Sequence, residues 1–219
     1  FHGREMEENI GYDIKIELGS LMLEEKKVPE AIKMLTEAVK FIPSEVKPRL
    51  LLAQAYEVMG NDSLRLSQIK SALKFAPGEW EPHYQAGRYY LSKGILNEAE
   101  LHLAQSIKLN PGHVRSRFDY GSLLLDLGNY TDAFEQLNTA LESEPNNARY
   151  LSIVAYALIL SGKQKEALEN IAVAIGKGMS DAQVLYWAGK VYYKAGKKEP
   201  ARQVFKDALS IDPSCASCF

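Results

Sequence analysis

Cysteine is nearly absent from this chain. Its 219 residues include two cysteines, Cys215 and Cys218, and both stand in the last five positions. No disulfide framework can therefore hold the remaining residues together. A single C-x-x-C pair could be half of a zinc site or a redox motif. Because no second pair and no strand–helix pattern accompany it, we interpret the two cysteines as incidental.

Long apolar runs and a strong charge of one sign are also missing. No stretch approaches 18 consecutive apolar residues, so we predict no transmembrane helix. The net charge is −2, from 26 basic and 28 acidic residues. This balance leaves no basic field for a phosphate backbone and argues against nucleic acid as a partner. The first residues lack the apolar core of a secretory signal, which favours the cytoplasm, although a removed signal would leave the same sequence.

Catalytic motifs are absent as well. The four histidines each stand in a different setting, at His2, His83, His102 and His113. The sequence contains no nucleophile elbow, no H-E-x-x-H zinc motif and no glycine loop that could hold phosphate. We therefore expect a protein that is not an enzyme and that has no metal site and no cofactor.

What the sequence does have is a period of 34 residues. Prolines mark this period at Pro43, Pro77, Pro111, Pro145 and Pro213. At the one position where the proline is missing, Gly176 and Gly178 can end a helix instead. Within each period the apolar residues recur at helical spacing on one segment and, after a turn, on a second. The sequence thus predicts an all-α chain of helical hairpins, repeated six times.

The period also predicts the position of each helix. First helices are expected at 12–25, 46–59, 80–93, 114–127, 148–161 and 182–195. Second helices are expected at 29–42, 63–76, 97–110, 131–144, 165–178 and 199–212. A glycine follows each of the last five first helices, where it can adopt a left-handed conformation, at Gly60, Gly94, Gly128, Gly162 and Gly196.

The same period divides the chain into repeats. They are expected at 12–45, 46–79, 80–113, 114–147, 148–181 and 182–213. Residues 1–11 are then an N-terminal tail or the end of a preceding repeat, and residues 214–219 are the truncated start of a further one. Phe1 and Phe219 stand where neighbouring repeats would carry large residues. We therefore expect the chain to be a piece of a longer array.

Small residues occupy the eighth place of every first helix. They are Gly19, Ala53, Gly87, Gly121, Ala155 and Gly189. Two helices can approach closely only at such positions, so we expect the two helices of a hairpin to touch there. The second repeat departs from the pattern, because Arg65 stands where the other second helices have alanine. We expect its stem to lie on apolar surface and its charged head to stay in water.

These patterns resemble the tetratricopeptide repeat, whose signature is W-x2-L-G-x2-Y, then A-x3-F, then P. The best copy is Leu185-x2-Ala188-Gly189-x2-Tyr192, Ala201-x3-Phe205 and Pro213. The tryptophan of the signature is absent from all six copies. The resemblance covers residues 12–213 and implies a right-handed superhelical α-solenoid whose first helices line a concave groove. It also implies protein–protein interaction, usually with an extended peptide or a helix.

Each first helix has a second stripe, at places 2, 5, 9 and 12, which share one helical face. In similar proteins this face lines the groove. The residues proposed to bind a partner here are Tyr84, Arg88, Leu91, Arg115, Phe118, Arg149, Tyr156, Tyr186 and Lys190. Tyrosine and arginine are common anchors in interfaces. In the alternative reading the aromatic residues fill the core between adjacent first helices, and the arginines lie on a solvated face.

The sequence therefore predicts a non-catalytic scaffold or adaptor. Its groove would bind a protein or peptide segment with apolar and acidic residues. Two other functions stay open. The chain could be a self-assembly module that forms homo-oligomers through exposed repeat ends, or the targeting region of a larger enzyme or of a secretion or assembly protein.

Overall fold

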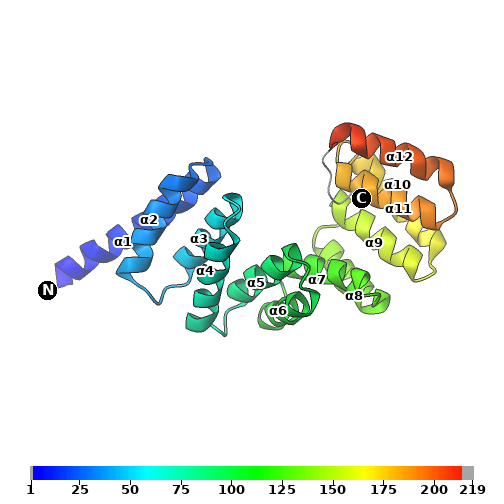
Figure 1. Ribbon diagram of the computed structural model, residues 1–219. Coiled ribbons are helices and arrows are strands. Elements are labelled where there is room, and N and C mark those ends of the chain that lie inside the picture. The colour runs from blue at the N-terminus through cyan, green and yellow to red at the C-terminus, as the bar shows by residue number, and fades with distance from the viewer. Residues whose placement is uncertain (1, 214–219) are drawn as a thin grey trace. The chain divides into compact units, whose positions relative to one another are not determined.

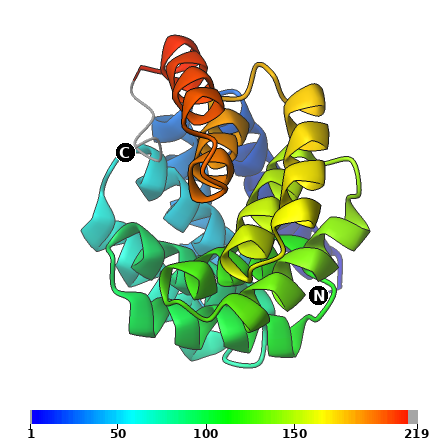
Figure 2. The same cartoon turned by 90° about the vertical axis from the view of Figure 1, so that its right-hand side faces the viewer.

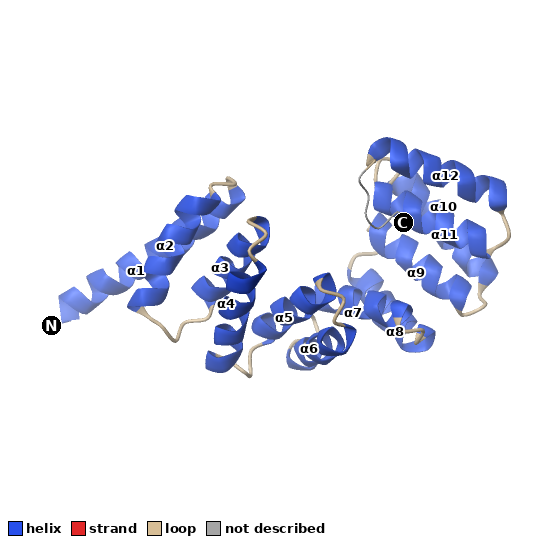
Figure 3. Cartoon of the chain, in the orientation of Figure 1, coloured by secondary structure: helices blue, strands red, loops and turns tan. Residues whose placement is uncertain are grey.

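The computed structural model describes residues 2–213, and the side chains of residues 10–213. The features predicted at Phe1, Cys215, Cys218 and Phe219 lie outside the described residues. Within these residues every regular element is a helix (Figure 3). The helices are α1 (His2–Glu24), α2 (Val28–Phe41), α3 (Lys47–Val58), α4 (Asp62–Phe75), α5 (Trp80–Ser92), α6 (Leu96–Leu109), α7 (Val114–Asp126), α8 (Tyr130–Ser143), α9 (Ala148–Leu160), α10 (Gln164–Lys177), α11 (Ala182–Lys194) and α12 (Lys198–Ile211). The described part of the chain is an all-α solenoid of helical hairpins.

The chain divides into two compact units, unit 1 (Phe1–Pro111) and unit 2 (Gly112–Phe219). In each unit the helices pair as consecutive hairpins whose two members lie side by side in both views (Figure 1, Figure 2). Each hairpin after the first in its unit packs its first helix on the second helix of the preceding hairpin. None of the described helices combines the length and the apolar character needed to span a membrane.

The helices lie within two residues of their predicted bounds except at one end. The first helix was expected from residue 12, but α1 begins at His2. The repeat pattern does not determine where the N-terminal end of α1 lies. Residues 4–8 are Arg, Glu, Met, Glu and Glu, which favour helix, and no proline interrupts them. Local propensity therefore extends the helix by about three turns beyond the start that the repeat predicts.

The small residues at the eighth place make the expected close approach. A Cβ atom on Gly121 would lie 2.6 Å from Cγ of Leu137, and one on Gly19 would lie 2.7 Å from Cγ of Leu35. The residue that fills this space is thus the large apolar residue of the second helix. The alanine four residues before Leu137, Ala133, is fully buried beside it and contributes its carbonyl oxygen to the same contact.

The turns within the hairpins share one backbone conformation. The glycines that follow the last five first helices all have positive φ, between 66° and 80°: Gly60, Gly94, Gly128, Gly162 and Gly196. In the first hairpin the same place is taken by Lys26, whose φ is 60°. A side chain is strained in this left-handed conformation, whereas glycine is not.

The buried alanine place is occupied by arginine in α4, and the expectation for it is wrong. The side chain of Arg65 is 4% exposed, so its charged head does not reach water. Its Nη2 atom lies 3.1 Å from Oε1 of Glu57 in α3, and its guanidinium group lies 5.4 Å from the centre of the Tyr89 ring in α5. The carboxylate of Glu57 and the ring face of Tyr89 come from the two adjacent first helices. They surround the charged head of Arg65 in place of the water expected from the sequence.

Candidate functional site

In unit 2 the three first helices α7, α9 and α11 lie next to one another, because α9 contacts both α7 and α11. They carry six of the residues proposed from the sequence to bind a partner. We call the surface that these helices form the unit 2 face. Its proposed residues are Arg115, Phe118, Arg149, Tyr156, Tyr186 and Lys190.

The centre of the unit 2 face is a lysine surrounded by three aromatic rings. Nζ of Lys190 lies 4.4 Å from the centre of the Tyr156 ring, 4.7 Å from that of Trp187 and 5.3 Å from that of Tyr186. The rings also contact one another, with centres 5.1 Å apart for Tyr156 and Trp187. Cation–π attraction to three faces holds the ammonium group in one place. We call these four residues the lysine cage.

The lysine cage is partly removed from water. Burial lowers the pKa of Lys190, while the carboxylate of Asp126 at the end of α7 partly opposes that shift. Burial also raises the pKa of the Tyr156 and Tyr186 hydroxyls, which therefore stay protonated at neutral pH. Among residues 10–213, Lys190 forms no hydrogen bond and no ion pair. The cage thus presents an ammonium donor beside two phenol donors, with the carboxylate of Asp126 near all three but not ion-paired with Lys190.

Phe118 has a different environment. Its ring stacks on that of Tyr150, with centres 4.6 Å apart and planes 28° apart, and it packs against the apolar core of unit 2. Ser152, at the corresponding place in α9, is fully buried and donates a hydrogen bond to the carbonyl oxygen of Arg149. At these two positions the fifth place of the first helix packs against neighbouring residues of unit 2.

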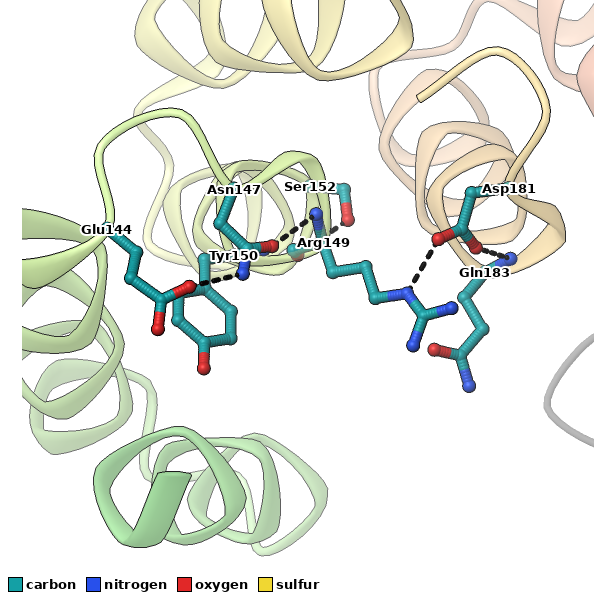
Figure 4. Close-up of polar contacts among 7 residues, drawn as sticks. All are labelled: Glu144, Asn147, Arg149, Tyr150, Ser152, Asp181 and Gln183. Atoms are coloured by element: carbon teal, nitrogen blue, oxygen red, sulfur yellow. Dashed lines mark hydrogen bonds and ion pairs between the residues drawn. The ribbon is translucent and has the colours of Figure 1, made fainter. Parts of the chain in front are cut away.

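Arg149 lies at the N-terminal end of the same helices, away from the cage. Its Nε donates to Oδ2 of Asp181 at 2.6 Å, and Oδ1 of Asp181 accepts from the backbone N–H of Gln183, which caps α11 (Figure 4). Asn147 caps α9 in the same way through the N–H groups of Arg149 and Tyr150. Arg149 therefore joins the starts of two adjacent first helices. Arg115, at the equivalent place in α7, is exposed.

The remaining proposed residues, Tyr84, Arg88 and Leu91, lie on α5 in unit 1. The guanidinium group of Arg88 lies 5.9 Å from the centre of the Tyr84 ring, and its Nη2 is 3.4 Å from Oε1 of Glu57. Leu91 is partly buried. Glu57 accepts both Arg88 and the buried Arg65, so its carboxylate links the interior of the hairpin to the surface of α5.

A second polar cluster in unit 1 joins two histidines. Nδ1 of His83 in α5 lies 3.0 Å from Nδ1 of His102 in α6, and Nε2 of His83 lies 3.1 Å from the carbonyl oxygen of Pro77. Because a carbonyl oxygen only accepts, His83 carries its proton on Nε2, and His102 donates from Nδ1. Burial first, and then His83, lower the pKa of His102, while Glu98 partly raises it. If the rings of His83 and His102 were both protonated, each of the two facing Nδ1 atoms would carry a hydrogen, and neither could accept from the other.

Sequence reasoning missed Trp187 and Asp126 as members of the site. Trp187 stands at the sixth place of its first helix, beside the stripe that was used to choose candidates. Its ring nevertheless reaches Lys190 and Tyr156. A tryptophan next to a tyrosine on a first helix was the signal that could have found it.

The comparisons with known proteins agree on one architecture. Family models described as "Tetratricopeptide repeat" match residues 90–155 and 182–215. The chain is similar to the structure of PilF of Pseudomonas aeruginosa, with 17% identity, 96% of each chain covered and a TM-score of 0.78. It is also similar to PilW, described as a widely conserved type IV pilus biogenesis factor, with 16% identity, coverage of 94% and 96%, and a TM-score of 0.77.

A third similar structure is YrrB, described as a TPR protein with an unusual peptide-binding site. It has 21% identity, 84% of this chain and 95% of the other are covered, and the TM-score is 0.66. No curated protein matches the chain by sequence. At these identities the similarity to the solved structures shows the fold.

Proposed function

Since the chain is a tetratricopeptide-repeat protein, we propose that it is a non-catalytic scaffold whose unit 2 face binds a peptide-like or helical segment of a partner protein. Tetratricopeptide repeats support protein interaction in general. The description of YrrB as a protein with a peptide-binding site agrees with this proposal. Our proposal for this chain concerns the place of binding and the chemistry of the partner.

The observation that carries the proposal is the lysine cage. An ammonium group that is partly desolvated, and whose nearby carboxylate Asp126 forms no ion pair with it, gains from an incoming anion more than an exposed lysine does. The Tyr156 and Tyr186 hydroxyls can donate to the same anion, since their pKa values are raised. The aromatic rings offer apolar area on either side. The partner segment therefore carries an aspartate or glutamate flanked by apolar residues.

Arg88 and Tyr84 in unit 1 form a second, separate contact for a partner in this proposal. Arg88 is already paired with Glu57, which reduces its gain from an added carboxylate. The lysine cage is therefore the main anchor. Phe118 packs against the core of unit 2 and stacks on Tyr150, so it is a weaker candidate for direct contact with the partner.

A random twelve-residue peptide library displayed on phage tests the proposal. Peptides selected on the wild-type protein should contain an acidic residue between apolar ones. Their dissociation constants are then measured by fluorescence anisotropy for the wild type and for two matched variants. Lys190→Met keeps most of the stem of the side chain and removes the charge. Lys194→Met makes the same change one turn further along α11, at an exposed residue outside the cage.

We expect Lys190→Met to weaken binding by about tenfold or more, because the charged partner of a carboxylate is lost. Lys194→Met should bind like the wild type. Tyr156→Phe, which removes one hydroxyl and keeps the ring, should give an intermediate loss. Selection of no peptide, selection of peptides without acidic residues, or equal binding by the two lysine variants would each overturn the assignment of the cage.

A further inference from the structure

The three rings of the lysine cage are held in place by residues other than Lys190. Tyr156 and Trp187 pack against the apolar core of unit 2. The ring of Tyr186 lies with its centre 5.2 Å from that of Trp187, at 63° to its plane, and 6.3 Å from the centre of the Phe205 ring in α12. We call Tyr156, Tyr186 and Trp187 the aromatic cage. Because these contacts do not involve Lys190, the aromatic cage should keep its shape when that side chain leaves it.

The space inside the aromatic cage has the size of an ammonium group. Nζ of Lys190 lies over all three rings, 4.4 Å, 4.7 Å and 5.3 Å from their centres. A cation is attracted to a ring face within about 6 Å of the ring centre. Two of the rings belong to α11 and the third to α9, which contact each other in unit 2 (Figure 1). Proteins use aromatic cages to bind quaternary ammonium ligands.

Lys190 occupies the cage because of its place on α11. It stands three residues after Trp187 and four after Tyr186, a spacing that brings side chains together on one face of a helix. Its ammonium group is therefore tethered beside the rings, and a tether gives a group a high local concentration. Any other cation must compete with this tethered ammonium group for the same space.

The ammonium group of Lys190 is nevertheless a poor match for the cage. It has three N–H donors, and among residues 10–213 it forms no hydrogen bond and no ion pair. Burial lowers the pKa of Lys190, which reflects the cost of taking these donors partly out of water. A quaternary ammonium group has no N–H, so it loses no donated hydrogen bond when it enters. It gains the same attraction to the rings at a lower cost.

The charges beside the cage are those of Asp126 and Lys194. Besides burial, the carboxylate of Asp126 acts on the pKa of both Tyr186 and Lys190, so it lies near the cage. Lys194, one turn further along α11, is exposed and has a smaller effect on the pKa of Lys190 than Asp126 has. When the side chain of Lys190 leaves the cage, the carboxylate remains beside the empty space and attracts a replacing cation.

We propose that the aromatic cage binds a quaternary ammonium group, which displaces the side chain of Lys190 into water. The trimethylated lysine of a partner segment and a free cation such as choline both present this group. Lys190 is then a built-in competitor that sets the affinity of the cage for its ligand. The inference concerns the same face as the proposed function, but it requires the three rings and not the charge of Lys190.

Tetramethylammonium chloride is the simplest probe of the aromatic cage. In a Trp80→Phe background Trp187 is the single tryptophan, so its emission reports on the cage, with sodium chloride at equal ionic strength as the blank. The emission should change saturably. Lys190→Ala, which leaves the cage empty, should lower the dissociation constant by about tenfold, because the tethered competitor is gone. Lys194→Ala is the matched control and should change it by no more than about twofold, since salt screens an exposed charge.

Loss of a ring tests whether the cation binds inside the cage. Tyr156→Leu, added to Lys190→Ala, removes the ring that α9 supplies and should abolish the saturable change, while circular dichroism checks that the helices remain. Binding that survives this change would place the cation elsewhere and overturn the inference. A Lys190→Ala protein that shows no saturable change, or that binds no more tightly than the protein with Lys190, would overturn it too.

Two further ligands separate the sources of the quaternary ammonium group. A short glycine-rich peptide with one trimethylated lysine is compared with choline and with the same peptide carrying an unmodified lysine. Tighter binding of the trimethylated peptide than of choline assigns the cage to a modified side chain, and the reverse order assigns it to a free cation. Equal binding of the two peptides would contradict the inference, because the unmodified ammonium group brings N–H donors for which the cage has no acceptor.

The same substitution distinguishes this inference from the peptide-binding proposal. Lys190→Ala should weaken the acidic peptides, which lose their cation, and strengthen tetramethylammonium, which loses its competitor. Acidic peptides that bind this variant as tightly as the wild type would contradict the peptide-binding proposal and leave the aromatic cage standing. Tetramethylammonium that binds both proteins equally would contradict the aromatic cage and leave the peptide-binding proposal standing.

Discussion

The guanidinium group of Arg65 and the carboxylate of Glu57 form an ion pair in which one partner is buried and the other is partly exposed. The side chain of Arg65 is 4% exposed and that of Glu57 is 32% exposed. Nε and Nη2 of Arg65 form no hydrogen bond with the described residues, although Nη2 lies 3.1 Å from Oε1 of Glu57. Glu57 has a second cation, Arg88, at 3.4 Å. Without Glu57 the buried guanidinium group of Arg65 would therefore lose its anion, whereas without Arg65 the carboxylate of Glu57 would keep Arg88.

This inequality predicts losses of stability of different size when Glu57 and Arg65 are replaced. Glu57→Gln leaves a buried guanidinium group without its carboxylate and should lower the free energy of unfolding by about 3 kcal/mol. Arg65→Met removes the buried charge, keeps a long flexible side chain and leaves Glu57 paired with Arg88, so the change should be within about 1 kcal/mol. Urea titrations followed by circular dichroism measure both. Equal losses for the two variants would contradict this account.

Gly121 and Gly176 predict opposite effects of the same substitution in unit 2. A Cβ atom on Gly121 would lie 2.6 Å from Cγ of Leu137 and 3.2 Å from the carbonyl oxygen of Ala133. Gly121→Ala should therefore cost about 1–3 kcal/mol through overpacking. Gly176 lies in the last turn of α10 and its Cβ would meet nothing within 4 Å. Gly176→Ala should stabilise the helix by up to about 1 kcal/mol. The shift of the urea midpoint gives the sign in each case.

The histidine pair predicts a loss of stability in weak acid. Burial and His83 lower the pKa of His102 in the folded chain below the ordinary 6.5. The unfolded chain therefore binds a proton at a higher pH than the folded chain does, and the stability present above pH 6.5 is lost as the pH falls. His102→Gln should show a smaller loss between pH 7.5 and pH 5. A wild type and a variant with the same pH dependence of the urea midpoint would refute the role of this pair.

The lysine cage predicts a fluorescence change in mild alkali. Trp80→Phe leaves Trp187 as the single tryptophan, because the chain has two. The pKa of Lys190 is lowered from 10.5, so its ammonium group loses its proton, and its attraction to the rings, at a lower pH than an ordinary lysine. Emission should change with a midpoint below pH 10.5. The step should vanish when Lys190→Met is added, and its persistence there would assign it to another group.

The positions of the helices could be predicted from the sequence because the repeat supplies several independent marks. Apolar spacing, glycine turns and closing prolines agree in the repeat from 114 to 147, and α7 and α8 follow those marks to within a residue. The start of α1 could not be predicted in this way. It depends on local helix propensity before residue 12, where the repeat pattern gives no mark.

The candidate site was predictable only as a face. Helical spacing places Tyr156, Tyr186 and Lys190 on one side of their helices, and the structure brings these three together. Spacing does not give the tilt between adjacent helices. The contact of Trp187 with Lys190 lies within α11 at i, i+3 spacing, whereas the contacts of Trp187 with Tyr156 and of Phe118 with Tyr150 join different helices and do not follow from spacing. Arg65 shows the same limit, since its burial depends on Glu57 and Tyr89 from the helices on either side.

The positive-φ glycines have a consequence for how such a gene changes length. Gly128 and Gly162 adopt the same left-handed conformation, and each is followed directly by the N-cap residue of the next helix. An unequal crossover that removed residues 129–162 would join Gly128 to Lys163 and leave the local backbone as it was. A duplication between the same points would likewise create no new kind of junction. The first hairpin is the exception, because Lys26 holds that conformation at a cost of about 1 kcal/mol.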